Sequence, residues 1–105
     1  MKYDRRKAPR ISVKLPIHWE GVFENSKADI TSLSRTGCFV LTGGRVSPRE
    51  LVRLEIQLPG EEPVRVWAEV VEEAYEIGFA ARFTSPDDED YDRLVRFITR
   101  ELAKK

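Results

Sequence analysis

The sequence has very few of the side chains from which metal sites and nucleophilic catalytic centres are built. Its 105 residues include one cysteine, Cys38, and one histidine, His18. A lone cysteine forms neither an internal disulfide nor a cysteine-based zinc site. Cys38 begins an apolar segment, as expected of a buried and unreactive thiol, and His18 falls on a polar strand face without catalytic or metal-binding partners. We therefore expect a protein that is not an enzyme and holds no metal and no cofactor.

Long hydrophobic runs are also missing. No segment approaches the roughly 18 apolar residues of a membrane-spanning helix, and residues 1–25 lack the apolar core of a signal peptide. We therefore expect a cytoplasmic protein without membrane insertion. The 18 basic and 18 acidic residues give a formal net charge of zero. This balance argues against binding of a nucleic acid polymer, because such binding needs many phosphate contacts.

Basic side chains are nevertheless concentrated at the N-terminus. They are Lys2, Arg5, Arg6, Lys7 and Arg10. Pro9 prevents this segment from continuing as a helix, so residues 1–10 are expected to form a flexible basic arm. Arg6 and Arg10 place two guanidinium groups four residues apart on this arm. Guanidinium groups bind phosphate oxygens as planar forks, which makes the arm suitable for a small anionic ligand.

Strict alternation of apolar and polar residues predicts β-strands through most of the chain. Every second residue from Ile11 to Trp19 is apolar, and similar alternation recurs over 52–58, 64–70 and 77–83. Shorter strands are expected over 29–34 and 38–42. About six strands at this spacing predict a single mainly-β domain, with a small six-stranded antiparallel β-barrel over residues 11–84.

One further strand is expected just after the first. Val22 and Phe23 predict a separate short strand, which a polar turn over residues 24–27 would end.

The final segment changes its period. Apolar residues recur at steps of three and four between Tyr91 and Leu102, which is typical of an amphipathic helix. Ser85 can cap this helix, Pro86 suits its first position, and the acidic residues that follow suit the positive end of its dipole. Residues 85–105 are therefore predicted as a C-terminal α-helix. Its apolar stripe must be buried against the barrel or against a partner.

Trp67 lies out of phase with the apolar face of its predicted strand, and Val71 shares this outer phase. Two interpretations stay open for these side chains. Either the C-terminal helix covers them, or Trp67 forms an aromatic platform for a ligand base or a partner.

A second polar cluster precedes the strand that begins at Cys38. Residues 32–37 read Ser-Leu-Ser-Arg-Thr-Gly and combine hydroxyl groups with a turn glycine. Hydroxyl and backbone N–H groups at a strand edge can bind phosphate oxygens. The basic arm and this cluster together indicate a site for a phosphate-bearing ligand.

In this order along the chain, the two motifs resemble those of the PilZ domain family of bacterial cyclic di-GMP receptors. Arg6 and Arg10 match the family's Arg-x-x-x-Arg motif, with an extra arginine at Arg5. Residues 32–37 align with its second motif, Asp/Asn-x-Ser-x-x-Gly, except that Ser32 stands where the family has Asp or Asn. The resemblance covers residues from about 5 to 100.

The resemblance implies a nucleotide-binding site for cyclic di-GMP, a second messenger with two phosphates and two guanines. The implied ligand-binding residues are Arg5, Arg6, Arg10, Ser32, Ser34 and Gly37. Arg6 and Arg10 would bind guanine edges and phosphates, because an arginine fork matches both. Arg5 would stack on a base or hold a second ligand molecule.

The serine motif completes the implied site. Ser34 would form a hydrogen bond with guanine or phosphate, and Ser32 would partly replace the family's Asp or Asn. Gly37 would supply a turn with positive φ and allow close approach of the backbone.

The resemblance also implies a signalling switch. Ligand binding would order the basic arm across the barrel and create a surface for an unidentified effector protein. Two other functions stay open: a PilZ-like interaction module that does not bind the nucleotide, and a small-barrel nucleic acid binder. The protein is expected to be a monomer or a homodimer, because the C-terminal apolar stripe could serve dimerisation as well as barrel packing.

Overall fold

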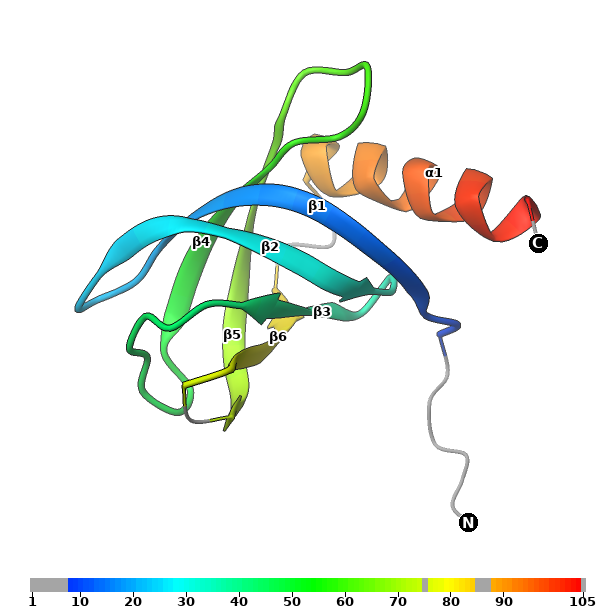
Figure 1. Cartoon of the computed structure of the whole chain (residues 1–105). Coiled ribbons are helices and arrows are strands. Elements are labelled where there is room, and N and C mark those ends of the chain that lie inside the picture. The colour runs from blue at the N-terminus through cyan, green and yellow to red at the C-terminus, as the bar shows by residue number, and fades with distance from the viewer. Residues whose placement is uncertain (1–7, 75, 85–87, 105) are drawn as a thin grey trace, which may run out of the picture.

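The computed structural model describes residues 8–74, 76–84 and 88–104, which form a β-barrel and one helix (Figure 1). The elements are β1 (Ile11–Glu20), β2 (Asn25–Leu33), β3 (Gly37–Leu41), β4 (Leu51–Ile56), β5 (Val64–Ala74), β6 (Gly78–Phe83) and α1 (Glu89–Ala103). The strands follow the order β1-β2-β3-β6-β5-β4 around the barrel, and β4 pairs back with β1. All pairings are antiparallel. The predicted fold class is thereby confirmed.

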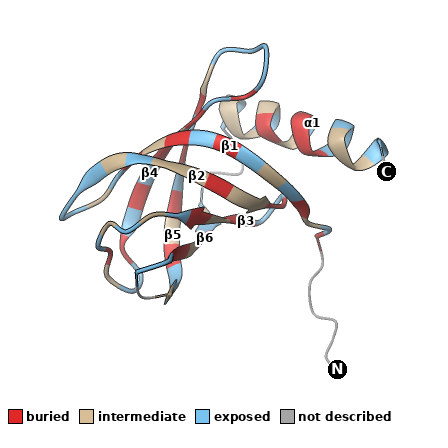
Figure 2. Cartoon of the chain, in the orientation of Figure 1, coloured by how far each residue is buried: buried red, intermediate tan, exposed pale blue. Residues whose placement is uncertain are grey.

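The alternation in β1 shows how the sequence builds this barrel. Leu15, Ile17 and Trp19 point inward and are buried, whereas the residues between them face outward (Figure 2). The ring of Trp19 meets Phe79 of β6 edge-on, with 5.3 Å between the ring centroids. Its indole Nε1 donates a hydrogen bond to the Thr42 hydroxyl at 3.4 Å. A continuous apolar core therefore fills the barrel, and burial of this surface is the main force that stabilises the fold.

The segment after β1 differs from the prediction. Val22 and Phe23 are exposed in the hairpin loop and form no strand. The backbone N–H of Gly21 donates to the Glu24 carbonyl at 2.8 Å, which closes a turn where a strand was expected. Of the predicted polar turn over residues 24–27, only Glu24 lies in the turn, and residues 25–27 begin β2, where Asn25 pairs directly with Glu20. The conformation of this segment is therefore determined by cross-strand pairing at the end of the barrel and not by the apolar content of the segment.

The helix α1 begins later than predicted. Its N-cap is Asp88, whose carboxylate accepts a hydrogen bond from the Asp90 backbone N–H at 2.8 Å. The predicted cap, Ser85, and the predicted first position, Pro86, lie outside the described residues. An aspartate is at least as good an N-cap as a serine, and the following acidic residues then occupy the first helical turn.

The apolar stripe of α1 packs on the protein's own barrel. Leu94, Phe97 and Ile98 are buried, and the helix contacts β5 and β1. Of the two expected ways of burying this stripe, the structure therefore shows barrel packing. Within the described part of the chain, no helix has the length and apolar character needed to cross a membrane.

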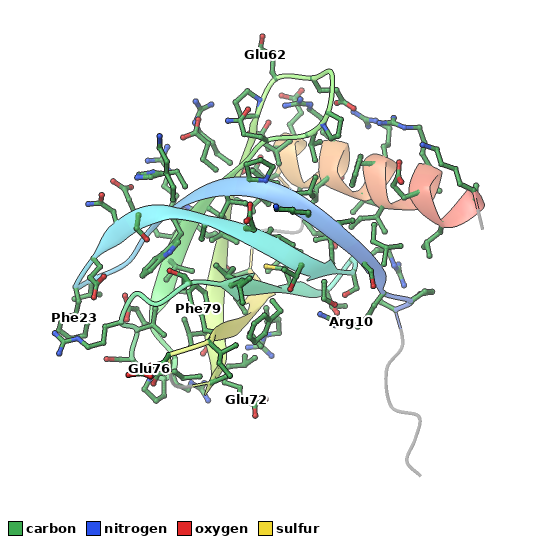
Figure 3. The ribbon with its side chains drawn as sticks, viewed as in Figure 1. Arg10, Phe23, Glu62, Glu72, Glu76 and Phe79 are labelled. Atoms are coloured by element: carbon green, nitrogen blue, oxygen red, sulfur yellow. The ribbon has the colours of Figure 1, made fainter. Side chains whose placement is uncertain are left out.

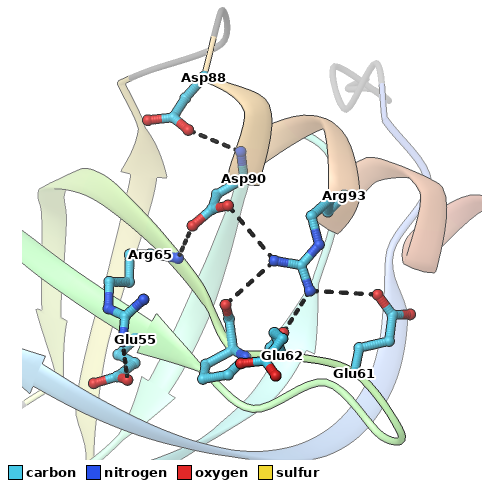
Figure 4. A network of polar contacts seen from close by, with 8 residues as sticks. Glu55, Glu61, Glu62, Arg65, Asp88, Asp90 and Arg93 are labelled. Atoms are coloured by element: carbon cyan, nitrogen blue, oxygen red, sulfur yellow. Dashed lines mark hydrogen bonds and ion pairs between the residues drawn. The ribbon is translucent and has the colours of Figure 1, made fainter.

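Two arginines of α1, Arg93 and Arg100, bind the loop between β4 and β5, and Figure 4 shows the contacts of Arg93. Arg93 donates to the backbone carbonyls of Glu62 and Pro63 at 2.5 and 3.3 Å. Arg100 pairs with the Glu61 carboxylate at 2.7 Å. This hydrogen bond from Arg100 is the main reason why the pKa of Glu61 is lowered. The contacts fix α1 against one end of the barrel.

The helix does not cover the outward-facing side chains of β5. Trp67 remains 46% exposed and Val71 is also exposed. The expectation that α1 buries them is therefore wrong, because α1 packs at one end of the barrel and its buried stripe faces the core. Both side chains are available for contacts with a ligand or a partner.

Candidate ligand-binding site

The barrel brings the basic arm to the serine motif. Arg10 immediately precedes β1, and the antiparallel register pairs Ile11 with Leu33 and Ser12 with Ser32. As a result, the Arg10 side chain reaches the end of β2, where its Nε donates a hydrogen bond to the Ser32 hydroxyl at 2.8 Å. Figure 3 shows Arg10 where the chain enters β1, far from Phe23 at the opposite end of the barrel.

Two predicted site residues, Arg5 and Arg6, lie outside the described residues. Their roles in ligand binding stay predictions. Of the arginines in the basic arm, the structure therefore describes only Arg10.

A surface hollow of about 240 Å³ lies beside Arg10. Thr36 lines it from the loop that follows β2, and Gly37 lines it from the start of β3. Val71 of β5 and Ala80 of β6 contribute apolar side chains. The hollow thus combines guanidinium groups, a hydroxyl and a small apolar surface. This combination suits a ligand with a flat base and a negatively charged group.

Ser34 shapes the turn next to this hollow. Its side chain is buried, and its hydroxyl oxygen accepts hydrogen bonds from the backbone N–H groups of Thr36 and Gly37 at 3.2 and 3.3 Å. A serine that bonds to the backbone two and three residues ahead is typical of a tight turn. The Ser34 hydroxyl thus stabilises the turn in this structure, and its predicted hydrogen bond to a ligand stays a prediction.

Gly37 is needed for a different reason than the one predicted. Its φ angle is not positive, so it supplies no left-handed turn. Instead it begins β3 and pairs with Arg82 of β6. A Cβ atom on Gly37 would collide with the backbone carbonyl oxygen of Ala81. The expected close backbone approach is present, but it is an approach to β6 of the same barrel.

The helix α1 also stabilises the turn over residues 34–37, through Tyr91. The Tyr91 hydroxyl of α1 donates to the Arg35 carbonyl at 2.6 Å. The Tyr91 ring also meets Phe83 edge-on, at a centroid distance of 6.1 Å, and the Phe83 N–H donates to the Thr36 carbonyl at 2.9 Å. The sequence assigned Tyr91 only to the apolar stripe, because nothing local links residues that lie 56 positions apart.

Tyr91→Phe is expected to loosen this turn without unfolding the protein. The phenyl ring keeps the contact with Phe83, while the hydrogen bond to the Arg35 carbonyl is lost. Amide hydrogen exchange at Thr36 and Gly37, followed by NMR, should accelerate by roughly three- to tenfold. Arg100→Ala is the control, because it weakens the attachment of α1 away from this turn. Equal exchange rates in the Tyr91 variant and the unsubstituted protein would contradict the prediction.

Cys38 also lines the hollow, and its side chain is buried. Its thiol is buried, and this burial raises its pKa to about 12, although the nearby Arg10 has a smaller opposite effect. The thiol is therefore protonated at neutral pH and poorly nucleophilic. Its predicted burial is confirmed. Across residues 8–74, 76–84 and 88–104, no three His, Cys, Asp or Glu side chains are arranged to hold a metal ion.

Solved structures of other proteins share this fold. The inhibitor of motility MotI/DgrA of Bacillus subtilis superposes with a TM-score of 0.77 at 22% identity, covering 98% of this chain and 54% of that one. The PilZ domain of YcgR from Escherichia coli, solved with c-di-GMP, superposes with a TM-score of 0.72 at 15% identity, and the match covers 97% of this chain and 99% of that one. The MrkH–c-di-GMP complex of K. pneumonia superposes with a TM-score of 0.70 at 20% identity, and the match covers 98% of this chain and 57% of that one.

These identities establish a common fold and nothing more. The chain spans about half the length of the MotI/DgrA and MrkH chains. No curated protein matches the sequence. The PilZ domain family model, in contrast, matches residues 4–100, which include both sequence motifs and the whole barrel. The chain therefore belongs to the PilZ domain family.

Proposed function

We propose that this PilZ domain is a cyclic di-GMP receptor. The contact between Arg10 and Ser32 is the main support, because it joins the two sequence motifs at the edge of a hollow. The structures of YcgR and MrkH that share the fold were solved with c-di-GMP. The ligand would be the second messenger itself, bound by a receptor module that is not an enzyme and needs no cofactor.

The chemistry of the hollow fits the parts of this ligand. Arg10 uses Nε for Ser32, which leaves the two terminal guanidinium nitrogens for a phosphate or for O6 and N7 of guanine. Val71 and Ala80 offer apolar surface to one face of a purine ring. The bond to Ser32 also holds Arg10 in place before binding, which reduces the entropy lost when the complex forms.

Signalling would follow from closure of the basic arm. Arg5 and Arg6 precede Arg10 by a few residues, so the ligand's negative charge would draw them over the hollow. The closed arm and the bound nucleotide would form a new surface for an effector protein. The receptor would act in the bacterial cytoplasm.

Isothermal titration calorimetry with cyclic di-GMP tests the proposal. We expect saturable binding, with a stoichiometry of one or two ligand molecules per chain. A linear dinucleotide, pGpG, serves as the control ligand, since it has the same bases without the closed ring. A titration that releases no binding heat, confirmed by unchanged NMR spectra, would contradict the receptor function.

Ser32→Asn is expected to maintain or strengthen cyclic di-GMP binding. An asparagine reaches further than a serine and offers both a donor and an acceptor, so it can bond to Arg10 and to a guanine edge together. One additional hydrogen bond corresponds to a gain of up to about tenfold in affinity. Calorimetry on the variant measures this gain.

Ser26→Asn is the matched control for that change, because Ser26 lies at the opposite end of β2 and pairs with Trp19. Its affinity should equal that of the unsubstituted protein. A large loss of binding in Ser32→Asn alone would mean that Ser32 does not occupy the Asp/Asn position of the family motif.

A second candidate function is an interaction module that does not bind the nucleotide. It is favoured by Ser32, which stands where the family has Asp or Asn, and by Ser34, whose hydroxyl is engaged in the turn. A second hollow, lined by Leu51 and Trp67, would then serve as the contact surface for a protein partner. The same titration separates the two functions.

A further inference from the structure

A second arginine lines the hollow beside Arg10. Arg82 of β6 pairs with Gly37 of β3, and the Arg82 side chain is 61% exposed. In the strand order, β3 lies between β6 and the end of β2 where Arg10 is bound. The two guanidinium groups therefore come from different sides of the same hollow, with the apolar side chains of Val71 and Ala80 also in its lining.

Arg82 is held in place by a carboxylate. Its Nη2 lies 2.5 Å from Glu69 Oε1, and Glu69 is its register partner on β5. The Glu69 side chain is only 14% exposed. Its other oxygen, Oε2, lies 2.9 Å from Nε of Arg49. One carboxylate thus serves two guanidinium groups, which leaves one positive charge uncompensated in this group of three side chains.

We propose that Arg82 is a further ligand-binding residue, which binds a phosphate of the ligand opposite Arg10, with Glu69 as its positioning residue. This inference rests on the proposed cyclic di-GMP function. The ligand carries two phosphates, and Arg82 is the second guanidinium group that the structure describes in the lining of the hollow. Since Arg82 uses one terminal nitrogen for Glu69, its remaining N–H groups are available to phosphate oxygens.

The positioning by Glu69 matters for affinity. A long arginine side chain on a barrel surface is free to adopt many rotamers, and ordering it on binding has an entropic cost. The short contact with Glu69 restricts Arg82 before the ligand arrives. Arg82 is therefore partly preorganised, as Arg10 is by Ser32.

Arg49 provides a matched control, because it binds the same carboxylate. Its side chain is 80% exposed and is not part of the hollow's lining. Arg82→Ala and Arg49→Ala each remove one positive charge and one contact to Glu69. Any effect on folding stability should therefore be similar in the two variants, whereas only Arg82→Ala removes a group from the hollow.

Calorimetry with cyclic di-GMP at two salt concentrations tests the proposal. Arg82→Ala should bind at least about tenfold more weakly than the unsubstituted protein, since hydrogen bonds to charged groups are involved. Its affinity should also depend less on salt, because one phosphate contact is lost. Arg49→Ala should stay within about twofold, and Arg82→Lys should recover part of the loss because it retains the charge.

Equal affinities of Arg82→Ala and Arg49→Ala would overturn the proposal. Arg10→Ala is included to separate this result from a failure of the receptor function. If Arg10→Ala loses binding while Arg82→Ala keeps it, the site exists and only the role of Arg82 is wrong. If the unsubstituted protein binds no cyclic di-GMP, both the receptor function and the role of Arg82 are overturned.

Discussion

Arg10→Ala is expected to abolish measurable cyclic di-GMP binding. Among the residues that the structure describes, Arg10 is the arginine that joins the two motifs, through its 2.8 Å hydrogen bond to Ser32. Removing one partner of a hydrogen-bonded charge pair typically weakens binding by about two to three orders of magnitude. Calorimetric titration of the variant should therefore show no saturation at ligand concentrations that saturate the unsubstituted protein.

The fold should tolerate this substitution. Arg10 is only partly buried and precedes β1, so its loss removes one side-chain hydrogen bond and no core packing. The thermal unfolding midpoint should change by only a few degrees. Unchanged ligand affinity in a folded Arg10→Ala protein would contradict the assignment of the site.

Arg96→Ala is the matched control for this experiment. Arg96 is an exposed arginine of α1, so its removal changes the net charge equally without touching the hollow. Its affinity should match that of the unsubstituted protein. Arg6→Ala is expected to lose binding as Arg10→Ala does, because Arg6 is the first arginine of the same motif.

Gly37→Ala is expected to destabilise the whole domain. The added methyl group would collide with the Ala81 carbonyl oxygen, and both residues belong to strands that pair around the barrel. Forcing one extra methyl group into a packed site costs about 1 to 3 kcal/mol. For a domain of this size, the loss corresponds to a fall of about 5 to 20 °C in the unfolding midpoint, which circular dichroism can follow.

Gly43→Ala is the control for this glycine, because a Cβ atom on Gly43 has no heavy atom within 4 Å and its φ is not positive. Its unfolding midpoint should be unchanged or slightly raised, since alanine restricts the unfolded chain more than glycine does. An unfolding midpoint of Gly37→Ala equal to that of Gly43→Ala would show that β6 moves to accept the methyl group.

Ser34 and Gly37 show that a sequence motif can be found without revealing the structural contacts of its residues. Both residues belong to the second motif, and the resemblance assigned both to the ligand. In the structure, Ser34 holds the turn and Gly37 lets β3 lie against β6. Their spacing is visible in the sequence. Their contacts depend on which strand becomes the neighbour of β3, and this follows from barrel closure.

The hairpin between β1 and β2 shows a similar limit of prediction from the sequence. Apolar content at Val22 and Phe23 predicted a strand, although the chain reverses there. Glu50, which is distant in sequence, accepts a hydrogen bond from the Val22 backbone N–H. Arg45 lies over the Phe23 ring, 5.2 Å from its centroid. These contacts from the loop after β3 stabilise a turn that a local pattern could not predict.

The sequence by itself determined the barrel strands, the C-terminal helix and the family, although not every boundary. A period of two predicted the barrel strands, a period near 3.6 predicted α1, and the two spaced motifs indicated the site. These signals depend on residues that are close in the sequence, so they can be recognised from the order of the residues alone. Only the tertiary structure decided which side chains meet. The pairs Arg10–Ser32, Tyr91–Arg35 and Arg82–Glu69 join residues 22, 56 and 13 positions apart. Their contacts arise from strand register and barrel closure, which depend on how all the strands and α1 pack together.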